Sequence, residues 1–260
     1  MPDIAMKTKK IIIIGDSHTD AIKKALKKHP FAESNINISA YRFQKIKNDK
    51  PIGDISIEHC MDMVSSLSEE DMVFSTIGGN QHQSFSLIQH PFPFEMYEPN
   101  CAEKNMLNDV PIIPYHVIWD VFASGLQGKD GERLQKIRNV AKCPVFHLVP
   151  PPPKKDTMHI LQNHESDFVK KGLLEKGVTP ANLRLKIWKL QIRVLSCLCR
   201  EWSIHLLSVP NDCLSEEGFL DIKYYANDAT HGNVSYGLQV LQQIIKVASG
   251  SDIMKEVVMI

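Results

Sequence analysis

A serine, an asparagine and an aspartate–histidine pair stand where they could share one piece of chemistry. Ser17 follows a short apolar run, Asn80 follows two glycines, and Asp228 precedes His231 by three residues. A serine hydroxyl is a poor nucleophile at neutral pH and needs a base within hydrogen-bond reach. Histidine suits that role because its unperturbed pKa is about 6.5. A carboxylate on the far ring nitrogen would fix the histidine tautomer, so these residue types point to nucleophilic acyl transfer.

The same chemistry needs donors for a negatively charged oxygen. The transition state of acyl transfer builds charge on the carbonyl oxygen, and preorganised N–H groups must receive it. The Ser17 backbone N–H, a glycine N–H and the Asn80 side-chain amide could supply them. The spacing of Asp228 and His231 would place both side chains on one face of a helical turn.

Alternating patterns predict the elements that carry these residues. Apolar, β-branched runs indicate strands at 11–14, 36–43, 71–77, 145–149 and 204–209. Amphipathic stretches indicate helices at 19–28, 57–67, about 180–200 and 234–247. Strands that alternate with helices favour an α/β fold with a parallel sheet covered on both faces.

This arrangement would bring the polar residues to one edge of the sheet. Ser17 lies just past the first predicted strand, Asn80 just past the third, and Asp228 and His231 after the fifth. Ligands of open parallel sheets bind beyond the carboxyl ends of the strands. We therefore expect the hydroxyl, the amide, the carboxylate and the imidazole to converge.

Three short motifs make the chain resemble the SGNH (GDSL-type) hydrolase family, and the motifs are spread over nearly the whole chain. The first block of that family is present as Gly15-Asp16-Ser17-His18, the third as Gly78-Gly79-Asn80-Gln81 and the fifth as Asp228-Ala229-Thr230-His231. The resemblance implies a flavodoxin-like, three-layer α/β/α sandwich with a central, mostly parallel five-stranded sheet. It implies no cofactor and no obligatory metal.

The resemblance also implies a role for each residue of the site. Ser17 would be the nucleophile, His231 the base and Asp228 the residue that orients the base. Asn80 and a glycine of the second block would donate to the oxyanion together with the Ser17 N–H. Gly53 is the candidate for that glycine, although no recognisable motif surrounds it.

Two departures from the family pattern concern the third and second blocks. Gln81 replaces the usual aspartate of the third block, and the second block is not recognisable. In the first block, His18 stands where many members have leucine. The first block with histidine also resembles SGNH domains attached to polysaccharide acyltransferases, which favours an O-acyl group on a sugar as substrate.

Neighbouring residues are candidates for contact with the substrate. His18, Gly79 and His82 lie beside the proposed nucleophile and oxyanion donor. His18 could equally hold another site residue by a hydrogen bond, and His82 could be a solvated loop residue. We expect Asp16 to hold backbone N–H groups in its turn rather than to act chemically.

Length, composition and charge bound the class of protein. The chain has 260 residues, of which 43% are hydrophobic, and 30 basic residues balance 30 acidic ones. We expect one domain over residues 1–260, with an insertion rich in proline and aromatic residues around 89–114 that is either a lid or surface packing. Balanced charge gives no reason to expect nucleic acid or an anionic membrane as partner.

The chain offers no sign of secretion or metal binding. The N-terminus has no secretory apolar region, and no stretch is long enough to span a bilayer. The six cysteines show no C-x-x-C pair, so we expect a cytoplasmic protein with reduced thiols and no metal.

Three functions fit these patterns. The first is a serine hydrolase that cleaves carboxylic esters, such as O-acetyl or other O-acyl groups on a carbohydrate or small molecule. The second is an O-acyltransferase that uses the same site, with an acceptor hydroxyl in place of water. The third is a binding protein that keeps the fold without catalysis. The sequence leaves the oligomeric state open.

Overall fold

The centre of the molecule is a parallel sheet, seen in the computed structural model that describes residues 8–30, 35–47, 50–97 and 109–250. Its five strands run in the order β2-β1-β5-β8-β9, and each neighbouring pair is parallel. The strands are β1 (Lys9–Gly15), β2 (Ile36–Arg42), β5 (Met72–Thr76), β8 (Val145–Leu148) and β9 (His205–Leu207). The predicted fold class and sheet are confirmed.

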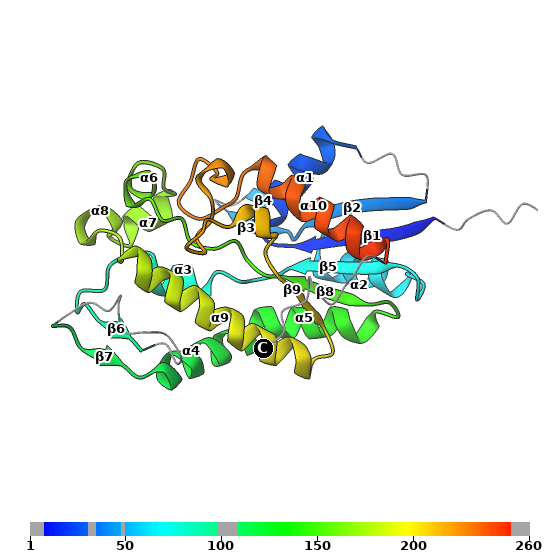
Figure 1. Cartoon of the computed structure of the whole chain (residues 1–260). Helices are drawn as coiled ribbons and strands as arrows, with labels where there is room; N and C mark the ends of the chain where they lie inside the picture. The colour runs from blue at the N-terminus through cyan, green and yellow to red at the C-terminus, as the bar shows by residue number, and fades with distance from the viewer. Residues whose placement is uncertain (1–7, 31–34, 48–49, 98–108, 251–260) are drawn as a thin grey trace, which may run out of the picture.

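Helices cover both faces of the sheet, which gives three layers (Figure 1). One face carries α1 (Thr19–Lys28) and α10 (Val234–Ala248), which pack against each other. The opposite face carries α2 (Ile57–Ser65), α5 (Lys129–Val140) and α9 (Ala181–Glu201). The pairing of α1 with α10 matters for function, because the first and last motifs flank these two helices.

Shorter elements complete the described chain. They are β3 (Lys45–Lys47), β4 (Lys50–Ile52), α3 (Gln81–Ser86), β6 (Glu95–Met96), β7 (Ile112–Ile113), α4 (Tyr115–Gln127), α6 (Thr157–Gln162), α7 (Ser166–Lys170) and α8 (Leu173–Lys176), with 3₁₀ turns at Asn211–Cys213 and Ile222–Tyr224. No helix in the described ranges is long and apolar enough to cross a membrane.

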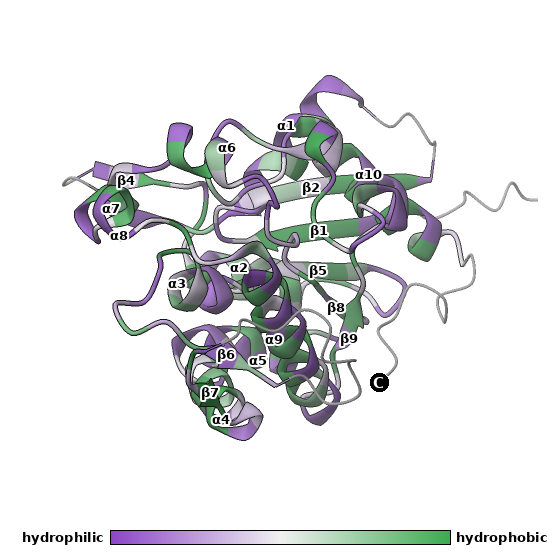
Figure 2. Ribbon diagram, turned by 60° about the vertical axis from the view of Figure 1, so that its left-hand side comes forward, coloured by the Kyte–Doolittle hydropathy of each residue, from purple (hydrophilic) through white to green (hydrophobic). Residues whose placement is uncertain are grey.

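Burial explains why the isoleucine run forms the central strand. Ile11, Ile13 and Ile14 are fully buried, because helices cover the sheet on both sides (Figure 2). Branched side chains suit such a strand, whose two faces are both apolar.

A glycine allows α1 and α10, the two helices on one face of the sheet, to pack closely. A Cβ on Gly237 of α10 would lie 2.2 Å from the carbonyl oxygen of Ala21 in α1.

The segment rich in proline and aromatic residues is only partly described, because residues 98–108 lie outside the described ranges. Its described part forms the short parallel pair of β6 and β7. Phe94 and Met96 are buried in the main core, whereas Phe92 is 78% exposed. Glu95 pairs with Lys186 of α9 at 3.0 Å. The described part therefore packs against α9 in the helical layer, and its role as a lid or binding loop stays a prediction.

Candidate active site

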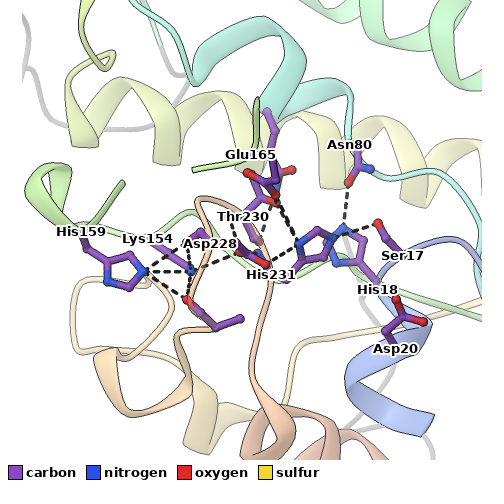
Figure 3. A network of polar contacts seen from close by, with 12 residues as sticks. Ser17, His18, Asp20, Asn80, Lys154, His159, Glu165, Asp228, Thr230 and His231 are labelled. Carbon is purple, nitrogen blue, oxygen red and sulfur yellow. Dashed lines mark hydrogen bonds and ion pairs between the residues drawn. The ribbon is translucent and has the colours of Figure 1, made fainter. Parts of the chain in front are cut away.

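The serine, histidine and aspartate form one hydrogen-bonded chain (Figure 3). Ser17 lies between the end of β1 and the start of α1, and its Oγ is 2.9 Å from His231 Nε2. His231 Nδ1 is 2.9 Å from Asp228 Oδ2. Both distances are ordinary hydrogen-bond lengths. In this arrangement the imidazole can take the proton of the hydroxyl while the carboxylate holds the other nitrogen.

A turn, rather than a helix, holds the aspartate and histidine. The expectation of a helical turn is wrong, because α10 begins only at Val234 and its N-cap is Asn233. Asp228 Oδ1 instead accepts the backbone N–H groups of Thr230 at 2.9 Å and His231 at 2.7 Å. The carboxylate thus fixes its own loop with one oxygen and the imidazole with the other.

The carboxylate stays ionised in this position. Burial raises the pKa of Asp228, but hydrogen bonds from His231, the nearby imidazole charge and the two backbone donors outweigh burial. The net effect holds the pKa of Asp228 below its ordinary range. An ionised acceptor is what stabilises an imidazolium on His231.

A buried lysine lies behind the aspartate. The Lys154 side chain has no exposed surface, and its Nζ lies 3.5 Å from Asp228 Oδ1. The same ammonium donates to the carbonyl oxygens of Asp228 at 2.5 Å and Ala226 at 2.7 Å. Arg184, also buried, donates to the Lys154 carbonyl oxygen at 2.8 Å. Lys154 therefore holds the loop that carries the aspartate, and Arg184 holds the backbone of Lys154.

A second carboxylate approaches the histidine. Glu165 Oε1 lies 3.7 Å from His231 Nδ1 and 3.4 Å from the Thr230 hydroxyl. In the described part of the chain, Glu165, Asp228 and His231 are the group whose donor atoms, all within 4.8 Å of one another, could hold a metal ion. A cation bound to His231 Nδ1 would compete with the hydrogen bond to Asp228.

The glycine–asparagine loop after β5 is tied to the serine loop. Gly78 N–H donates to Asp16 Oδ2 at 2.9 Å, and Arg133 of α5 donates to the same oxygen at 2.7 Å. The sequence predicts that Asp16 holds backbone N–H groups of its own turn; its side chain does hold a backbone N–H, but that group belongs to Gly78 in the neighbouring loop. Asp16 therefore fixes where Asn80 stands relative to Ser17.

His18 contacts the asparagine directly. Its Nε2 lies 2.8 Å from Asn80 Oδ1, and its ring centroid lies 4.9 Å from that of His231. His18 is only 8% exposed. Burial, with a further contribution from the charge of His231, lowers the pKa of His18 to about 3, so the ring is neutral at neutral pH.

Two other predicted residues lie away from the serine. His82 is buried within α3, where its Nδ1 lies 3.2 Å from Gln191 Oε1, so a solvated loop position is wrong for it, whereas its contact with a substrate stays a prediction. Gly79 packs against Pro150, and its carbonyl oxygen accepts a hydrogen bond from Gln191. Neither lines the cavity beside Ser17.

Gly53 also lies outside that cavity lining. It follows β4 and approaches the backbone so closely that a Cβ there would lie 2.4 Å from the Phe43 carbonyl oxygen. This contact explains the glycine without an oxyanion role. The Gly53 N–H as oxyanion donor stays a prediction.

A cavity of about 420 Å³ opens beside the serine–histidine pair. Most of the residues that line it carry polar or charged groups, and they come from the Ser17 loop, α1, the Tyr225–Val234 region, α10, Glu165 and Arg42. Arg42 pairs with Asp20 at this wall. A smaller cavity, also lined by His18, is more apolar and is lined by His147, a buried residue whose Nδ1 has no hydrogen-bond partner among the described residues. Burial lowers the pKa of both His147 and His82 to about 4.

Sequence signals could not have indicated several of these contacts. Lys154 and Glu165 come from a polar stretch between β8 and α9 that has no periodic pattern, and Arg133 lies on an ordinary amphipathic helix. Only the motif residues carried a recognisable signal.

Comparison with known proteins finds remote structural likenesses. No family model matches the chain, and no curated protein matches it in sequence. A GDSL-like lipase from Bacteroides thetaiotaomicron is 14% identical, with a TM-score of 0.42 over 92% of this chain and 87% of that one. Phospholipase A1 from Streptomyces albidoflavus is 13% identical, with a TM-score of 0.45 over 91% of this chain and 99% of that one.

A third solved structure is a variant of an acetyl-xylooligosaccharide esterase from Geobacillus. It is 12% identical, with a TM-score of 0.44 over 94% of this chain and 96% of that one. Each of these likenesses is remote. The chemistry of the site is therefore inferred from the side-chain geometry of the chain itself.

Proposed function

We propose that the protein is a serine hydrolase that cleaves carboxylic esters through an acyl-enzyme intermediate. The single observation that carries the proposal is the unbroken hydrogen-bonded chain from the Ser17 hydroxyl through His231 to Asp228. It joins a nucleophile, a base and an orienting carboxylate, each in the role that acyl transfer requires.

The reaction proceeds in two halves. Ser17 Oγ attacks the ester carbonyl while its proton passes to His231 Nε2, and the imidazolium then protonates the departing alcohol. Water enters, gives its proton to His231 and attacks the acyl-serine, which releases the acid and restores the Ser17 hydroxyl. Asp228 holds the Nδ1 proton throughout, and the Ser17 N–H and the Asn80 amide receive the negative charge on the carbonyl oxygen.

The cavity supports a polar substrate. Its lining is rich in charged and polar side chains, and its volume of about 420 Å³ suits a small molecule or a short carbohydrate unit. The proposed substrate is therefore an ester whose alcohol part is hydrophilic, such as an O-acetyl or other O-acyl group on a sugar.

A panel of chromogenic acyl esters and O-acetylated sugars tests the proposal. The parent protein should hydrolyse at least one of them, and Ser17→Ala should reduce turnover to background. A product that forms only when a sugar acceptor is added would show an acyltransferase instead. A folded parent without turnover on any ester, with or without acceptor, would contradict both enzymatic functions.

A further inference from the structure

The contact between His18 and Asn80 has two chemically distinct forms. An asparagine amide can be turned over, and a neutral histidine carries its proton on either ring nitrogen. In the structure Asn80 Oδ1 faces His18 Nε2 at 2.8 Å, so Nε2 must carry the proton and donate it. The opposite pair would have Asn80 Nδ2 donating to an unprotonated Nε2.

The two forms have opposite consequences at the reacting carbonyl. When His18 Nε2–H holds Asn80 Oδ1, both amide protons on Nδ2 are directed elsewhere, and no described residue accepts them. They are then available to a developing oxyanion. In the opposite form the amide oxygen would face the site, where it would repel that charge.

Burial favours a fixed, neutral His18. The residue is only 8% exposed, and its pKa of about 3 keeps one proton on the ring at working pH. His18 also lies between the two loops of the site. It is the N-cap residue of α1, directly after Ser17, and it contacts the loop that follows β5. It can therefore set the asparagine relative to the nucleophile.

We propose that His18 is a positioning residue that selects the amide orientation of Asn80 by donating from Nε2. The proposal rests on the proposed function, since it assigns Asn80 to the oxyanion. His18 itself does not touch the reacting atoms in this role.

A double-mutant cycle on the full chain tests the coupling. Asn80→Ala should lower kcat by ~10²-fold or more, as expected for an oxyanion donor. His18→Leu keeps a buried apolar side chain but removes the donor, and should lower kcat by about tenfold, the upper worth of one neutral hydrogen bond. KM should change little in both. Added to Asn80→Ala, His18→Leu should have almost no further effect.

A matched variant separates positioning from packing. His18→Gln carries an amide N–H at about the position of the imidazole Nε2–H, so it should restore kcat to within about threefold of the parent. Thermal unfolding of every variant should stay close to that of the parent. Nitrogen-15 NMR of the parent imidazoles should show His18 with its proton on Nε2.

The outcomes separate the two claims. A parent without turnover would contradict the proposed function. An active parent would contradict the positioning role if the His18→Leu and Asn80→Ala effects multiplied, if His18→Gln were no better than His18→Leu, or if NMR placed the His18 proton on Nδ1.

Discussion

Replacement of Asp228 by asparagine is a sharp test of the hydrogen-bond geometry. The new amide can place its oxygen in one of two positions. If the oxygen replaces Oδ1, it still accepts the backbone N–H groups of Thr230 and His231, now at 2.9 and 2.7 Å. If it replaces Oδ2, the NH₂ group faces both of those donors. The first orientation is favoured because it keeps the two hydrogen bonds to the backbone N–H groups and brings the NH₂ group against only one donor, the His231 Nδ1–H.

That orientation places an NH₂ group 2.9 Å from His231 Nδ1, where Oδ2 now stands. Two donors cannot face each other, so the imidazole must move its proton to Nε2, the nitrogen that faces Ser17. The base is then in the wrong tautomer. Such an exchange in a Ser-His-Asp site costs ~10⁴-fold in kcat, which is ~5.4 kcal/mol at 1.36 kcal/mol per tenfold change.

The assay is steady-state turnover of a chromogenic ester by Asp228→Asn and by a control, Asp62→Asn, at an exposed aspartate of α2. We expect ~10⁴-fold lower kcat for the first, with the Tm within a few degrees of the parent because the loop hydrogen bonds survive. The control should match the parent. A folded Asp228→Asn protein that kept more than a tenth of the parent kcat would refute the reasoning.

Three further predictions concern stability. Burial lowers the pKa of His18, His82 and His147, so the folded protein keeps these three side chains neutral while the unfolded chain protonates them below about pH 6.5. The free energy of unfolding should therefore fall as the pH is lowered from 6.5 to about 4, by up to ~1.4 kcal/mol per pH unit for each histidine. His147→Leu should reduce this pH dependence of the free energy of unfolding, measured by urea denaturation at several pH values, by the contribution of one histidine. An unchanged pH dependence would contradict the prediction. Lys154→Met removes the ammonium that donates to the carbonyl oxygens of Ala226 and Asp228, although His159 Nε2 still lies 3.1 Å from both, and should lower the free energy of unfolding by ~1–3 kcal/mol; equal urea midpoints would contradict this. Gly237→Ala should lower the Tm despite the better helix propensity of alanine, because its Cβ would meet the Ala21 carbonyl oxygen at 2.2 Å, and a higher Tm would show that the helices can separate at no cost.

The sequence predicted the sheet and its helices because their signals are local. A run of four β-branched isoleucines that ends at a glycine favours a strand buried on both faces, and β1 is such a strand. Ser17 lies just before α1 and His231 just before α10. Because α1 and α10 pack against each other on one face of the sheet, the two residues lie at the same edge.

The rest of the site depends on contacts between residues far apart in the chain. Lys154 reaches Asp228 across 74 residues, and Arg133 reaches Asp16 across 117. No periodic pattern in the sequence indicates such long-range pairs. The burial of His82 also follows from packing against Gln191 of α9 rather than from its own neighbours. The spacing of Asp228 and His231 fits a helix and a turn equally well, and the carboxylate's own backbone hydrogen bonds decide for the turn.

Covalent labelling with a fluorophosphonate probe tests most directly whether Ser17 is an activated nucleophile. Intact-mass analysis of the parent should show one adduct, and peptide mapping should place it on Ser17. Labelling should be absent in Ser17→Ala and much slower in His231→Ala. A folded parent that takes up no probe, or an adduct that persists in Ser17→Ala, would contradict the proposed mechanism.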